Sequence, residues 1–279
     1  MIFLAASILS SSLTSVLMRS FEDRWRYKMG MFAVNYLTCM VLACLFAGRI
    51  ALYTPQPGFG TAAVLGCIAG ILFLVCFMLL QLNIQKNGLA MASVFMRLGV
   101  VLSTLIAIVF FHETPKITQG AGILLAVLSI LLIHSDGYEK RKSASKWLLP
   151  VLLVCGGITD SIANTFDKIG NPAVKDYYLF YTFAAAFLCA AGVMLLRHER
   201  IRTWEIVSGL LIGIPNYFST RFLLLALGRL PAVIVYPAVN TGTIVLVSLA
   251  GVFLFRETLS RRKITALAII CLALVLLHI

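Results

Sequence analysis

Apolar and polar positions form long blocks along this chain, without the short alternation that is typical of β-strands. Ten apolar runs are each of the order needed for a helix that crosses a bilayer, which takes about 20 residues. The predicted spans lie at about residues 1–18, 29–48, 60–84, 89–111, 117–134, 147–167, 177–196, 204–227, 232–255 and 263–279. The pattern predicts an all-α membrane protein with ten transmembrane helices and leaves no segment for a soluble domain.

The second half of the chain repeats the pattern of the first. Phe-His-Glu-Thr at 111–114 returns as Phe-Arg-Glu-Thr at 255–258, and a histidine closes the apolar run that follows each motif. Gly70-Ile71 likewise matches Gly213-Ile214. A duplicated pattern of this kind indicates two copies of one structural unit.

The repeat divides the chain into residues 1–134, a polar linker at 135–146 and residues 147–279. Each copy has five predicted spans. Because five is odd, the second copy enters the membrane from the opposite side, which predicts two inverted five-helix repeats.

Composition strengthens the membrane assignment. The chain is 61% hydrophobic and only 12% charged, whereas soluble domains carry about 25% charged residues. The net charge of +12 comes from short basic clusters between apolar runs, so we expect contact with anionic lipids and no nucleic-acid partner. The seven cysteines all fall inside apolar runs and are expected to be small buried apolar residues.

Lysine and arginine concentrate in the loops after the first, third, fifth, seventh and ninth spans. The positive-inside rule places such loops in the cytoplasm, and both chain ends would then lie outside.

Charged residues within the spans are candidate functional residues, because lipid exposure of a charge costs several kcal/mol. Arg97 lies near the middle of its span and shares a helix face with Ser93 and Thr104. It either forms a structural ion pair or takes part in substrate binding or gating.

A polar stripe marks the span at 147–167. Asp160, Asn164, Asp167 and Lys168 recur on one helix face, and Asp160 lies about 12 Å along the helix from Lys168. A carboxyl group at this depth can carry a proton across the membrane. The alternative is a salt bridge from Asp160 to Arg97 or Arg221 that only holds the two halves together.

Polar side chains also interrupt three further spans, and prolines 215 and 237 each remove a backbone hydrogen bond there. Such interruptions are tolerated where they border a cavity, although Asn and Tyr also join helices without a functional role. Together with Arg97 and Asn164, the polar side chains of these three spans form the predicted substrate-binding set: Asn35, Tyr36, Arg97, Asn164, Asn216, Tyr217, Thr220, Arg221, Tyr236 and Asn240.

Small residues and helix-start signals complete the pattern. Glycines 66, 70, 209 and 213 are expected to allow close helix packing, and the spans at 117–134 and 263–279 carry so few polar residues that they serve packing alone. Thr114 with Pro115 can begin the former span, and Thr258 or Ser260 can begin the latter.

Ten spans in two copies, each with a fourth span that ends in Phe-His-Glu or Phe-Arg-Glu, resemble the EamA-like transporters of the drug/metabolite transporter superfamily. The resemblance is most specific over residues 89–134 and 232–279. It implies a secondary transporter, commonly an exporter of small metabolites in the prokaryotic plasma membrane, with both chain ends in the cytoplasm. That orientation is opposite to the one that the loop charges predict.

A second likeness concerns the first helix of each copy. The small multidrug resistance branch of the superfamily carries an essential glutamate eight residues before a lysine. Asp160 and Lys168 keep that spacing, whereas the first copy has Ser11 and Arg19. The resemblance therefore implies one proton-coupling site, at Asp160.

We therefore expect a secondary active transporter that exports a small organic metabolite by alternating access, with proton coupling. An exchanger of anionic substrates such as sugar phosphates or nucleotide sugars, with Arg97 and Arg221 as the anion site, is an alternative, and a non-transporting membrane scaffold is another. The chain contains neither a Gly-x-x-x-x-Gly-Lys phosphate loop nor a His-Glu-x-x-His motif, so we expect no enzyme activity and no cofactor. The expected partners are the substrate, protons and the bilayer, as a monomer or a homodimer.

Overall fold

The structure is a computed structural model that describes residues 1–21, 24–25, 28–47, 56–87, 89–134, 147–199, 201–255 and 261–278. These residues form helices and no β-strand. The helices are α1 (Ile2–Phe21), α2 (Lys28–Ala47), α3 (Phe59–Asn87), α4 (Leu89–Phe111), α5 (Ile117–His134), α6 (Leu148–Ile169), η3 (Pro172–Val174), α7 (Lys175–Leu196), α8 (Thr203–Leu227), α9 (Ala232–Phe255) and α10 (Arg261–His278). The all-helical prediction is confirmed, with one α-helix for each predicted span.

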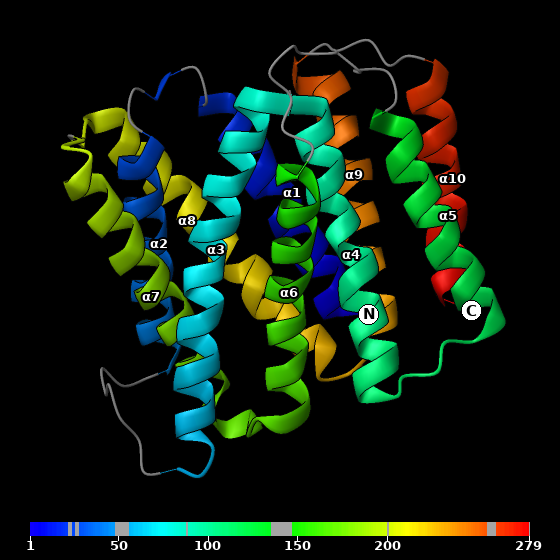
Figure 1. The fold of residues 1–279 in the computed structure, drawn as a ribbon, viewed down its shortest axis with the longest axis horizontal. Helices are drawn as coiled ribbons and strands as arrows, with labels where there is room; N and C mark the ends of the chain where they lie inside the picture. Colours follow the sequence, from blue (N-terminus) through cyan, green and yellow to red (C-terminus); the bar gives the residue numbers. More distant parts are fainter. Residues whose placement is uncertain are drawn as a thin grey trace.

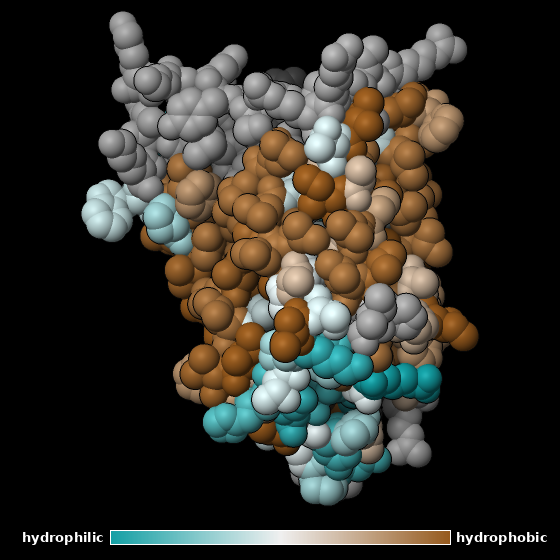
Figure 2. All heavy atoms as spheres, turned by 90° about the vertical axis from the view of Figure 1, so that its right-hand side faces the viewer, coloured by the Kyte–Doolittle hydropathy of each residue, from teal (hydrophilic) through white to brown (hydrophobic). Residues whose placement is uncertain are grey.

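By length and composition, seven helices in the described part of the chain can cross a membrane: α1, α2, α3, α6, α7, α8 and α9. The other three contain shorter apolar stretches within the described residues, at Leu98–Phe111, Ile117–Ser129 and Ile264–Ala273. Figure 2 shows a broad hydrophobic band on the side of the molecule that carries α5 and α10, with hydrophilic residues gathered at its lower end. A surface of this kind matches the apolar interior of a bilayer beside a polar interface.

The helices stand side by side with roughly aligned long axes, and helices of the two halves alternate across the bundle (Figure 1). Helix α2 packs against α7 and α8, α3 against α6 and α7, α1 against α8 and α9, and α5 against α10. Most of the helix packing therefore joins one half of the chain to the other. In the predicted repeat, α1 to α5 correspond to α6 to α10 in order. The α3–α7 contact then corresponds to the α8–α2 contact, and the α4–α6 contact to the α9–α1 contact.

Glycines bring pairs of helices close together across this interface, as the sequence predicts. A methyl group built on Gly70 of α3 would lie 2.1 Å from the carbonyl oxygen of Thr182 on α7. On α8, a methyl group on Gly213 would lie 2.6 Å from Cβ of Thr38 on α2. Both distances are far inside van der Waals contact, so these positions require glycine at the observed helix separations.

Two groups of buried apolar residues form the core. One draws on α2, α3, α6, α7 and α8, and the other mainly on α1, α4, α8 and α9. Ala163 of α6 packs against both groups. Helix α6, which carries the predicted polar stripe, therefore runs along the boundary between the two cores.

The predicted start of the fifth span at Thr114 is wrong. Helix α5 begins at Ile117, and the backbone N–H of Lys116 donates to Oε1 of Gln119 at 3.0 Å, so a glutamine caps this helix. The chain leaves helical geometry at His112, which has a φ of 52°, and residues 112–116 form a non-helical connection. The predicted starts at Thr258 and Ser260 lie outside the described residues.

Candidate functional site

Three predicted site residues meet between α6 and α9. The hydroxyl group of Tyr236 donates a hydrogen bond to the backbone carbonyl of Asp160, and Nδ2 of Asn240 donates to the carbonyl of Tyr236 at 3.1 Å. Tyr236 is buried, whereas Asp160 and Asn240 are half-buried. The Tyr236 hydroxyl thus connects α9 to α6 at the level of Asp160.

Asn164 lies one helical turn from Asp160 on α6 and is only 1% exposed. Its side-chain nitrogen has no hydrogen-bond partner among the described residues. Leaving a buried donor unpaired costs about 1–3 kcal/mol, so such a group points to a bound water or ligand. The four residues Asp160, Asn164, Tyr236 and Asn240 are called the α6–α9 cluster below.

Three further buried hydroxyl groups have no hydrogen-bond partner among the described residues. They belong to Thr104 on α4, Thr118 on α5 and Thr243 on α9. With about 1.5 Å of rise per residue, Thr243 lies about 15 Å along α9 from Val233, and Asp160 lies about 12 Å along α6 from Lys168. Val233 and Lys168 both contact the side chain of Glu113, so they lie at the same end of the bundle. Thr243 and Asp160 therefore lie at similar depth.

A second group of predicted residues joins α2 to α8. Nδ2 of Asn216 lies 3.4 Å from Oδ1 of Asn35 and 3.7 Å from the sulfur of Cys39. Tyr36 is buried in the core, with its ring 6.1 Å from that of Phe32. The two asparagines therefore join α2 to α8 by a hydrogen bond.

Arg221 on α8 has three neighbours. Its Nη1 donates to the hydroxyl oxygen of Tyr217 at 2.5 Å and lies 2.9 Å from Oδ1 of Asp176, in the first turn of α7. The guanidinium carbon also lies 4.7 Å from the centre of the Phe46 ring. Tyr217 and Arg221 thus pair at helical spacing, and the hydroxyl of Thr220 likewise donates to the carbonyl of Asn216 at 3.1 Å.

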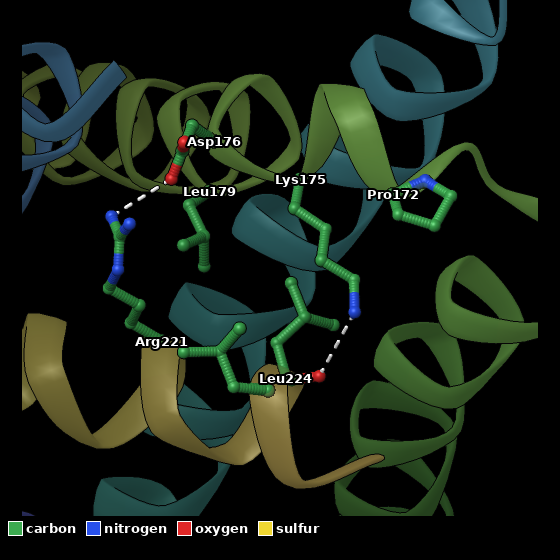
Figure 3. Close-up of a pocket in the computed structure, with 7 residues that line it drawn as sticks. Pro172, Lys175, Asp176, Leu179, Arg221 and Leu224 are labelled. Carbon is green, nitrogen blue, oxygen red and sulfur yellow. Dashed lines mark hydrogen bonds and ion pairs between the residues drawn. The ribbon is translucent and has the colours of Figure 1, made fainter. Parts of the chain in front are cut away.

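A cavity of about 150 Å³ lies beside Arg221, between α7 and α8 (Figure 3). Its lining residues are Pro172, Lys175, Asp176, Leu179, Arg221, Leu224 and Leu225. Nζ of Lys175 lies 3.0 Å from Asp167 and 3.5 Å from the carbonyl oxygen of Leu224. The cavity therefore offers charges of both signs next to leucine side chains.

Arg97 lies within α4, as predicted, but its side chain lies outside the described part of the structure. An ion pair between Arg221 and Asp160, which was one alternative for Asp160, is not the contact that the structure gives for Arg221, which pairs with Asp176. The α6–α9 cluster and the Arg221 cavity are thus two distinct polar regions.

Glu113 is a buried acidic residue that the sequence analysis missed. Its Oε1 lies 3.0 Å from Nζ of Lys168 at the end of α6, and its Oε2 accepts a hydrogen bond from the backbone N–H of Val233 at 3.0 Å. Glu113 belongs to the Phe-His-Glu-Thr motif, which we used only as a marker of the repeat. Its recurrence as Glu257 was the available signal, and Glu257 itself lies outside the described residues.

Comparisons with known proteins agree with the fold. A solved crystal structure of a protein with 15% sequence identity superposes with a TM-score of 0.75 and covers 99% of this chain and 94% of its own. An uncharacterized protein of Haemophilus influenzae is 22% identical over 198 residues, which are 69% of this chain and 67% of that protein. Residues 1–135 match the model of the EamA-like transporter family. The first half of the chain is therefore similar to the EamA-like transporter family, as the motifs in its sequence indicated.

Proposed function

We propose that this protein is a secondary active transporter that moves a small organic metabolite across the membrane by alternating access, with export coupled to protons. The α6–α9 cluster is the observation that carries the proposal. It combines a deep carboxyl group with a buried amide nitrogen that has no hydrogen-bond partner in the described part of the chain, on a helix at the boundary between two cores. Buried polar groups of this kind are retained in membrane proteins where substrates or ions pass.

The helix packing supports two inverted five-helix repeats at residues 1–134 and 147–279. Helix contacts exchange in pairs between the two halves, as two equivalent units facing each other would produce. In transporters built this way, the binding site lies between the repeats, near the middle of the bilayer. Asp160 and Thr243 lie at about that depth.

Asp160 would exchange a proton for substrate, because it is the deep acid on the helix that corresponds to the coupling helix of small multidrug resistance proteins. Asn164, Tyr236 and Asn240 would orient the substrate beside it. The contact from Tyr236 goes to the backbone of Asp160, so its geometry does not depend on the protonation of the carboxyl group.

The Arg221 cavity favours a second candidate, the exchange of anionic substrates. Its guanidinium and the ammonium group of Lys175 lie on one small cavity near the end of the helices, where a phosphate or carboxylate can be bound by charge-assisted hydrogen bonds. An incoming anion would have to displace Asp176 from Arg221. This candidate predicts transport that requires a counter-substrate and ignores the proton gradient.

A thermal-shift screen over amino acids, nucleosides and sugar phosphates tests the proposal, since a ligand that binds only the folded state stabilises it. We expect one class of compound to raise the melting temperature of the wild-type protein and to leave the melting temperature of Asn164→Ala unchanged. Transport of that compound would then be measured in proteoliposomes with and without a pH gradient. If no class of compound stabilises the protein, the scaffold alternative is favoured.

The proposed location is a prokaryotic plasma membrane. Its orientation can be measured by attaching a tag after residue 279 and testing its accessibility in intact cells. An external tag would agree with the charge of the loops, and an internal one with the family.

A further inference from the structure

Glu113 connects both halves of the protein at one end of the helix bundle. It follows α4 of the first half, whereas its two partners lie at the end of α6 and the start of α9 in the second half. The contact thus joins the end of the helix that carries Asp160 to the start of the helix that carries Tyr236.

The two interactions of Glu113 differ in character. The hydrogen bond from the N–H of Val233 caps the first turn of α9, where the helix dipole favours a negative charge. The Lys168 ion pair adds a second charged interaction. Because the Glu113 side chain is only 7% exposed, water screens both interactions weakly.

Lys168 and Glu113 can separate at little cost if the contact opens. The Lys168 side chain is 37% exposed, so water can solvate its ammonium group after separation. Glu113 lies in the non-helical connection at residues 112–116, which can move without breaking a helix. The contact is therefore strong when closed but can open without leaving a buried lysine.

We propose that the contact of Glu113 with Lys168 and the start of α9 is a gate that closes the transport pathway at this end of the bundle. The inference rests on the proposed alternating-access function and assigns a conformational role to residues outside the predicted substrate site. When the contact opens, the start of α9 and the end of α6 separate, and the α6–α9 cluster becomes accessible from this end. Under alternating access, closure at the opposite end accompanies that opening, because the site is open to one side of the membrane at a time.

Hydrogen–deuterium exchange measured by mass spectrometry tests the gate without a substrate. Three variants of the full chain separate the interactions. Glu113→Gln keeps an acceptor for the N–H of Val233 but removes the charge, Lys168→Gln removes only the ion pair, and Glu113→Ala removes both. The matched control is Asp167→Asn, which breaks a 3.0 Å ion pair to Lys175 that lies within the second half.

A gate predicts changes of opposite sign at the two ends of the bundle. Exchange in the first turn of α9 rises by about tenfold in Glu113→Gln and Lys168→Gln, the order expected for loss of a charge-assisted interaction. Exchange in the first turn of α8, which lies at the other end, falls in the same variants. The control changes exchange only near residues 167–176.

A rise that is confined to the residues around Glu113, with no change at the start of α8, would overturn the gate and leave a static helix cap. If Glu113→Ala does not fold, the two glutamine variants still decide between these outcomes. The readout contains no substrate, so a failed ligand screen and a failed gate are distinguishable. The former bears on the proposed transport, and the latter on Glu113 alone.

Discussion

The hydroxyl group of Tyr236 on α9 donates a hydrogen bond to the backbone carbonyl of Asp160 on α6. This bond joins two helices through the residue that carries the deep carboxyl group. Because the acceptor is the backbone carbonyl, the bond positions α6 without using the carboxyl group of Asp160. The α6–α9 cluster depends on this contact for its geometry.

Tyr236→Phe tests that contact, since it removes one hydroxyl group and keeps the buried ring. We expect the free energy of unfolding to fall by about 1 kcal/mol, the usual net value of one hydrogen bond, as measured by denaturant or thermal unfolding in detergent. Binding of the compound found in the ligand screen should weaken as well. Unchanged stability and binding would show that the bond does not hold the cluster.

Asn164→Leu separates function from stability, because it replaces a buried amide that has no partner with an apolar group of similar size. Stability should stay the same or rise, since an unpaired buried donor is removed, while the thermal shift caused by the ligand is lost. The matched control is Ser161→Ala on the same helix, whose hydroxyl donates to the carbonyl of Gly157 at 2.7 Å. That control should keep the ligand response. A ligand response that survives in Asn164→Leu would remove Asn164 from the site.

Gly70→Ala should destabilise the protein by about 1–3 kcal/mol, because the added methyl group overlaps the carbonyl of Thr182 and forces α3 away from α7. Gly60→Ala on the same helix is the control, since a methyl group there meets no atom of the described structure within 4 Å. It should be neutral or gain up to about 1 kcal/mol from helix propensity. Equal thermal stabilities of the two variants would contradict the close packing of α3 on α7.

Arg221→Gln tests the anion-exchange alternative with inorganic phosphate as the probe. If the cavity binds anions, phosphate raises the melting temperature of the wild-type protein, and the shift disappears in Arg221→Gln. Arg229→Gln is the control for loss of one positive charge, because Arg229 is exposed, its guanidinium lies 4.6 Å from the Phe3 ring, and it does not line the cavity. The same phosphate response in all three proteins would count against an anion site at Arg221.

The apolar runs of the sequence were sufficient to predict the helices, because a long apolar segment placed in lipid has helical hydrogen bonding as its available solution. The repeat also pointed to the close packing at Gly70 and Gly213, which occupy matching positions in the two halves. These features depend on local composition and on spacing along the chain, both of which a single sequence displays.

The partners of individual polar groups could not be predicted in the same way. The sequence allowed an ion pair of Arg221 with Asp160 as one alternative, but Arg221 pairs with Asp176 at the start of α7. The bonds from Glu113 to α6 and α9 cross between the halves of the chain, so no local spacing reveals them. Such contacts depend on which helix faces which, and tertiary packing decides this.

Proton movement that accompanies transport tests the central claim most directly. Wild-type protein and Asp160→Asn would be reconstituted in vesicles that contain a pH-sensitive dye, and the compound identified by thermal shift would be added outside. We predict that the wild-type protein moves protons out of the vesicles in exchange for the compound that enters, whereas Asp160→Asn moves none and retains only exchange of labelled for unlabelled compound. Proton movement by Asp160→Asn at the wild-type rate would contradict the proposed coupling.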